Sequence, residues 1–214
     1  MKLENGWFVL DTNDKAFEWF NYTSDTTTLI NKVYGFADVF SDMLFRKDSI
    51  TEKMVKCQFD WGDHIIDLPF ALSYFDYFMF RFSVESLEEC DGRYEMWEQR
   101  LIINPDQLNN DSIILHEMIH LHESVLMTLP IFFHEAVIYC LYTDLLAKIP
   151  NLNSIIEDCT HLYNCMLMAE EGGLHDMLFL LKSFDIDLRF DWPLGTTYGY
   201  DMKDRIEHYL KEGK

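Results

Sequence analysis

The residues best suited to chemistry lie in the segment 115–124, which reads Leu-His-Glu-Met-Ile-His-Leu-His-Glu-Ser. His116 and His120 are four residues apart, so on a helix both imidazoles lie on one face and can reach the same metal ion. Zinc held in this way keeps a coordination position for water, and the carboxylate of Glu117 can take the proton of that water as it attacks a carbonyl. The spacing therefore predicts a zinc site with Glu117 as general base.

The residues around this motif predict a buried helix over about 111–128. At 100° per residue, His116, His120, Glu123 and Met127 form one narrow stripe, and nearly all other positions are apolar. A polar stripe along a buried helix needs partners, which a metal ion can supply. The alternative is an ordinary core helix whose histidines are hydrogen-bonded.

A catalytic zinc held by two histidines is one protein ligand short. Glu123 shares their face but lies about 10 Å along the helix axis from His116, which is too far for one ion to reach easily. The next candidates are adjacent, His134 and Glu135, on a helix expected over 131–148. Helical angles put Glu135 opposite the polar side of that helix, so Glu135 is the expected third ligand and His134 the alternative. Weaker candidates for the third ligand are Glu170, Glu171 and His175.

The stretch from Leu101-Ile102-Ile103-Asn104-Pro105 to the motif resembles the zincin metallopeptidases, in particular small single-domain gluzincins and SprT-type proteins. The resemblance covers about 94–142 and implies an α+β fold, a zinc cofactor and hydrolysis of a peptide or protein substrate. In gluzincins the third ligand is a glutamate on the following helix, similar to Glu135; in SprT-type proteins it is a histidine, which points to His134. The metzincin pattern is absent, because Glu123 and Leu126 stand where its glycine and third histidine would be.

A tetrahedral intermediate also needs a group that stabilises the oxyanion. Tyrosines near the motif are the candidates, although tyrosines on apolar faces are more often core residues. The first choices are Tyr139 and Tyr142, and the others are Tyr198, Tyr200 and His175.

The chain has 214 residues and a net charge of −20, with five cysteines and no C-x-x-C pair. Its length and apolar content predict one domain over 1–214. The negative charge repels nucleic acid and anionic lipid headgroups, whereas a basic substrate would be attracted. The cysteine pattern and the absence of an apolar run at the N-terminus predict a cytoplasmic protein. The apolar stretch 124–142 contains Pro130 and two polar residues, so it predicts two helices rather than a membrane span.

The remaining patterns predict a small antiparallel sheet early in the chain and a mostly helical second half. Strands are expected at 6–11 and 53–59, and an alternating strand at 78–85 is followed by the hairpin dipeptide Asp91-Gly92 and a strand at 94–103. An edge hairpin at this point would lie above the metal, where an extended peptide can pair with it. Helices are expected at 14–21, 26–46, 152–170, 174–184 and 201–211.

Two other functions fit parts of the sequence. Glu117 and His120 form a Glu-x-x-His half-motif of helical di-iron proteins, but the chain has no second copy. A non-catalytic zincin-like domain that binds another protein is also compatible with the acidic, aromatic-rich composition.

Overall fold

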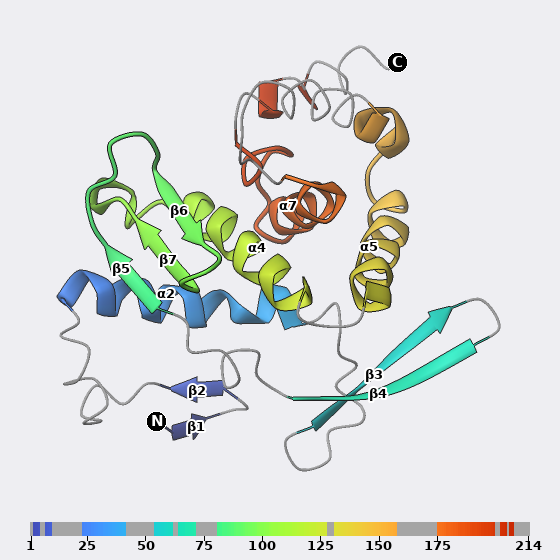
Figure 1. Ribbon diagram of the computed structural model, residues 1–214. Coiled ribbons are helices and arrows are strands. Elements are labelled where there is room, and N and C mark those ends of the chain that lie inside the picture. The colour runs from blue at the N-terminus through green and yellow to red at the C-terminus, as the bar shows by residue number, and fades with distance from the viewer. Residues whose placement is uncertain are drawn as a thin grey trace. The chain divides into compact units, whose positions relative to one another are not determined.

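The computed structural model describes residues 2–4, 7–9, 23–41, 54–61, 64–71, 81–127, 131–157, 175–199, 202–204 and 206–207 (Figure 1). Contacts group the chain into two compact units, Met1–Leu121 and His122–Lys214. The division falls inside one continuous helix, α4 (Asp111–Met127). A single domain over 1–214 remains a prediction.

The first unit contains a three-stranded sheet with the order β5-β7-β6. Its strands are β5 (Arg81–Val84), β6 (Gly92–Glu95) and β7 (Arg100–Ile103). β6 runs antiparallel to β7, whereas β5 runs parallel to it. The predicted α+β class is therefore confirmed, but the sheet is mixed rather than antiparallel.

The predicted hairpin turn at Asp91-Gly92 is wrong. The tight turn joins β6 to β7 through 96–99, where Gln99 adopts a φ of 49°. The segment expected as one strand at 94–103 is thus split into parts of two strands. Asp91 instead pairs with the residue after β7, because its carbonyl accepts a hydrogen bond from the Asn104 N–H at 2.9 Å.

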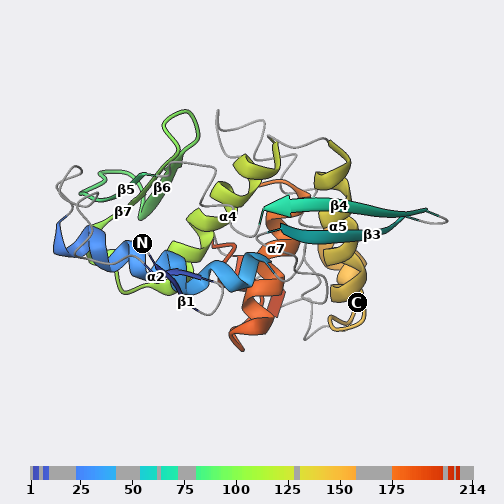
Figure 2. The ribbon, with the colours of Figure 1, turned by 90° about the horizontal axis from the view of Figure 1, so that it is seen from below.

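Helices α2 (Ser24–Ser41) and α4 supply the helical part of the first unit. α2 lies alongside β5, as both views show (Figures 1 and 2). Lys32 of α2 donates to Asp111, the first residue of α4, with 2.6 Å between Nζ and Oδ1. The apolar side chains buried in this unit include Leu29, Ile30, Val33, Leu101, Ile102, Ile103, Ile114, Leu115, Met118 and Ile119.

Two further antiparallel pairs precede the sheet. One joins β1 (Lys2–Glu4) to β2 (Trp7–Val9), and the other joins β3 (Met54–Trp61) to β4 (His64–Ala71). The predicted strands at 6–11 and 53–59 are confirmed by β2 and β3, whereas β4 was not predicted. The helix expected at 14–21 lies outside the described residues, as does the end of the one expected at 26–46.

In the second unit α5 (Ile131–Leu146) packs against α7 (Met177–Arg189) (Figure 2). Helical residues also occur at 152–157, 202–204 and 206–207, within the segments expected to be helical. Along the described part of the chain, no helix combines the length and apolar character that crossing a bilayer requires. The buried apolar residues of α5 and α7 include Val137, Leu141, Leu145, Leu178, Phe179, Leu181 and Phe184.

The chain after α7 is anchored by the carboxylate of Asp187, which is fully buried. Oδ1 accepts hydrogen bonds from the Thr197 N–H at 2.9 Å and the Thr197 hydroxyl at 2.6 Å, and Oδ2 accepts one from the Gly195 N–H at 2.7 Å. Burial raises the pKa of Asp187 to about 6, and these hydrogen bonds partly oppose the shift. Gly195 has a φ of 90°, a conformation in which glycine is unstrained. Asp187 therefore fixes the loop that leads to Tyr198.

We expect Asp187→Ala to lower the free energy of unfolding by about 3 kcal/mol, because it removes the carboxylate that accepts three buried hydrogen bonds. Urea denaturation followed by circular dichroism measures the change. Asp144→Ala is the matched control, since Asp144 is exposed and pairs with the exposed Lys148, just beyond the end of α5. An equal loss of stability in the two variants would contradict the anchoring role of Asp187.

Candidate metal centre

The two motif histidines lie one turn apart on α4, as the spacing predicted. Their ring centroids are 5.4 Å apart, with an angle of 78° between the ring planes. Both side chains are half-buried, whereas the neighbouring residues Leu115, Met118 and Ile119 are buried. The apolar neighbours thus hold the helix in the core and leave both imidazoles partly accessible.

Glu117 lies against strand β6 and is only 5% exposed. Its carboxyl group accepts a hydrogen bond from the backbone N–H of Tyr94. Burial raises the pKa of Glu117 to about 8, although the Tyr94 hydrogen bond and the charge of Arg93 act in the opposite direction. At neutral pH this carboxyl group is therefore mostly protonated, and a metal cation bound next to it would lower the pKa.

The close approach of Glu117 to β6 depends on Gly92. A Cβ atom at this position would lie 2.8 Å from Glu117 Cγ and 2.9 Å from its Oε1. These separations are shorter than real Cβ contacts, so only glycine fits without a shift. Gly92 therefore serves helix–strand packing and not the hairpin turn expected of Asp-Gly.

Among the described strands β6 pairs with β7 alone, so the side of β6 that meets Glu117 is an edge of this sheet. Asp91 and Asn104 form a hydrogen-bonded pair, and along an antiparallel ladder such pairs alternate with pairs that are not hydrogen-bonded to each other. In this register the backbone groups of Gly92 and Tyr94 point away from β7. An edge strand does lie beside the motif helix, but it is β6; β7, which directly precedes the helix, is the central strand.

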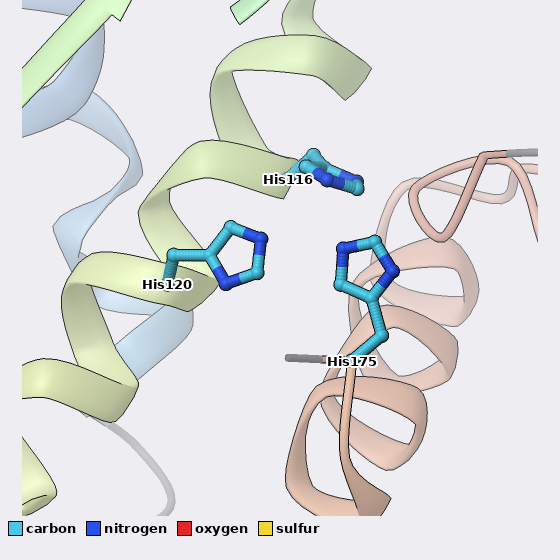
Figure 3. A group of neighbouring side chains, drawn as sticks. All are labelled: His116, His120 and His175. Carbon is cyan, nitrogen blue, oxygen red and sulfur yellow. The ribbon is translucent and has the colours of Figure 1, made fainter. Parts of the chain in front are cut away.

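His175 lies in the coil immediately before α7 and is 9% exposed. Its ring packs on Phe179, with 4.1 Å between centroids, and on Tyr198 at 5.3 Å. One donor atom from each of His116, His120 and His175 lies within 4.8 Å of the other two. Figure 3 shows the three rings directed toward one another. In the part of the chain that the structure describes, no other group of three histidine, cysteine or acidic side chains meets this criterion.

Neither expected third ligand belongs to this group. Glu135 is exposed on α5, whereas His134 is half-buried, with its Nε2 3.5 Å from Asp176 Oδ2. The inward and outward faces of α5 were therefore predicted the wrong way round. His134 shares its face with the buried Val137 and Leu141, at spacings of three and four residues. The error arises because α5 is apolar on most sides, so its polar residues did not mark the solvent face.

The two tyrosines chosen as oxyanion candidates also face away from the core. Tyr139 is 63% exposed, and the Tyr142 hydroxyl donates to Asn153 at 2.8 Å. Tyr198, a secondary candidate, is 4% exposed and packs on His175.

His175 was only a reserve candidate from sequence, because it lies 55 residues after His120 and belongs to no motif. One local feature of the sequence could have indicated that His175 is held in place. Asp176 caps α7 by accepting a hydrogen bond from the Phe179 N–H at 3.0 Å, so a rigid helix starts immediately after the histidine.

No protein-family model, curated protein or solved structure matches this chain.

Proposed function

We propose that this protein is a zinc-dependent peptidase in which His116, His120 and His175 hold the metal ion. The observation that carries the proposal is the approach of one donor atom from each histidine to within 4.8 Å of the others. Three histidines are an established donor set for catalytic zinc, which leaves the fourth position to water. His175 replaces Glu135 as the third ligand in this proposal.

The spacing of the donor atoms is compatible with zinc after small side-chain rotations. Two nitrogens bound tetrahedrally at about 2.0–2.1 Å from zinc lie about 3.4 Å apart. Donor nitrogens up to 4.8 Å apart can be brought to this separation by small rotations of the imidazole rings. The donor group contains no carboxylate, which does not favour the di-iron alternative.

Glu117 is the proposed general base, and β6 is the proposed binding edge for the peptide. A bound zinc ion would acidify its water ligand and polarise the scissile carbonyl. Glu117 would accept the water proton on its carboxylate and pass it to the leaving amine. An extended peptide pairing with the backbone of Gly92 at this edge would run beside that carboxylate, which already accepts the Tyr94 N–H. The net charge of −20 favours basic peptides.

The first experiment is to measure zinc per chain in the purified protein and then hydrolysis of basic and acidic peptide libraries. We expect one zinc ion per chain and cleavage that a chelator abolishes and added zinc restores. A protein that binds no zinc would refute the proposal. Zinc binding without turnover of any peptide would indicate the non-catalytic, protein-binding alternative.

We also propose a cytoplasmic location, where thiols such as that of Cys90 stay reduced.

We expect Gly92→Ala to lower peptide hydrolysis by about tenfold to a hundredfold without loss of zinc. The added methyl group would displace the Glu117 carboxyl group, and a misplacement of about 1 Å can cost this much activity. Gly35→Ala is the matched control, because a Cβ at Gly35 of α2 would meet no atom within 4 Å. Steady-state kinetics on zinc-loaded protein provides the test, and full activity in Gly92→Ala would exclude a tight fit between Glu117 and β6.

A further inference from the structure

Asp176, the residue after His175, contacts groups from α5, α7 and the part of α4 that belongs to the second unit. Its Oδ1 accepts the capping hydrogen bond from the Phe179 N–H of α7 at 3.0 Å, and its Oδ2 lies 3.5 Å from His134 Nε2 of α5. Its carboxyl group also shares a hydrogen bond with the side chain of Glu123, on the last turns of α4. One carboxylate thus connects α4, α5 and α7 at the point where the chain leaves His175.

The hydrogen bond between Glu123 and Asp176 needs one proton between two carboxyl groups. Glu123 is 8% exposed, and burial together with the negative charge of Asp176 raises its pKa well above the ordinary value. The raised pKa favours Glu123 as the partner that carries this proton. The bond is local to the second unit, and it joins a residue three positions after His120 to the residue next to His175.

We propose that Asp176 is a positioning residue that holds His175 where it can bind metal, with Glu123 and His134 as its partners. The inference rests on the proposed function, because it presupposes metal binding by His175. His175 and Asp176 are in coil immediately before α7 begins at Met177. The bonds of Asp176 restrain that backbone, while Phe179 and Tyr198 restrain the ring. Groups that orient metal ligands typically change metal affinity by about tenfold to a hundredfold when removed.

Asp176→Ser separates the positioning role from helix capping. Serine caps a helix about as well as aspartate, but it is too short to reach Glu123 and His134. We expect zinc affinity to fall by about tenfold to a hundredfold, while the far-UV circular dichroism and the thermal midpoint of the metal-free protein stay close to wild type. The cobalt-substituted variant should also show altered visible absorption, because His175 would coordinate less regularly.

Glu123 provides a second, independent pair of variants. Glu123→Gln keeps a donor toward the Asp176 carboxylate, so zinc affinity should stay near wild type. Glu123→Ala removes the donor and should weaken zinc binding as Asp176→Ser does. Asp144→Ser, an exposed substitution on α5, is the control and should leave zinc affinity unchanged.

The outcomes separate this inference from the proposed function. If the wild-type protein binds no zinc, the proposed function fails and the inference fails with it. If wild type binds zinc but folded Asp176→Ser and Glu123→Ala bind it equally well, only the positioning role is overturned. If Asp176→Ser does not fold, the contrast between Glu123→Gln and Glu123→Ala decides the question.

Discussion

Replacing His175 with alanine should weaken zinc binding by on the order of a thousandfold. A structural zinc site contributes about 10–16 kcal/mol in total, so each of its few protein ligands accounts for several kcal/mol. Three protein ligands are the usual number for a catalytic zinc, and with two the ion is easily lost to solvent or chelators. A competition titration against a chromophoric zinc chelator measures the affinity directly.

Glu135→Ala and His134→Ala are the matched variants for this test. Glu135 is exposed, so its removal should leave zinc affinity unchanged. His134→Ala should have at most the smaller effect of a lost partner of Asp176. If Glu135→Ala lost zinc and His175→Ala retained it, the glutamate predicted from the gluzincin resemblance would be the ligand. Thermal denaturation of metal-free His175→Ala checks that the lost ring contacts with Phe179 and Tyr198 have not unfolded the second unit.

Glu117→Gln should lower kcat/KM for peptide hydrolysis by about a hundredfold to ten-thousandfold, which is the usual contribution of a general base. Glutamine has nearly the same shape, and its carbonyl oxygen can still accept the hydrogen bond from the Tyr94 N–H. It cannot take a proton from water. Zinc content should therefore stay at the wild-type level while turnover is lost, and single-turnover kinetics on zinc-loaded protein would measure the loss.

Glu98→Gln is the control for this substitution, because Glu98 is exposed in the turn between β6 and β7. Its activity should be unchanged. The stability of Glu117→Gln should not fall, because the substitution removes an ionisable group from a buried position. Wild-type turnover in zinc-loaded Glu117→Gln would rule out Glu117 as the base and leave the metal centre without its proposed chemistry.

Local patterns in the chain predicted helices where α2, α4, α5 and α7 are observed, and they placed His116 and His120 on one face of α4. α4 was predicted over 111–128 and observed over Asp111–Met127, because its apolar positions and polar N-terminal residues act within a few turns. The same holds for the one-turn spacing of His116 and His120, which depends only on helix geometry.

The pairing of the strands and the identity of the buried face of α5 could be determined only from the tertiary structure. Asp91-Gly92 has the composition of a hairpin turn, yet Gly92 is needed because Glu117 packs against it from a different element. In the same way, α5 is apolar on nearly all sides, so only its packing partner decides that His134 faces inward and Glu135 outward.

The sequence by itself determined a motif helix that places two histidines on one face beside a carboxylate, since residues four apart on a helix share a face wherever the helix is placed. Only the tertiary structure decided that His175 accompanies them and that Glu117 is buried against the open edge of β6. Such contacts between residues distant in sequence depend on how helices and strands pack, and no local spacing encodes that packing.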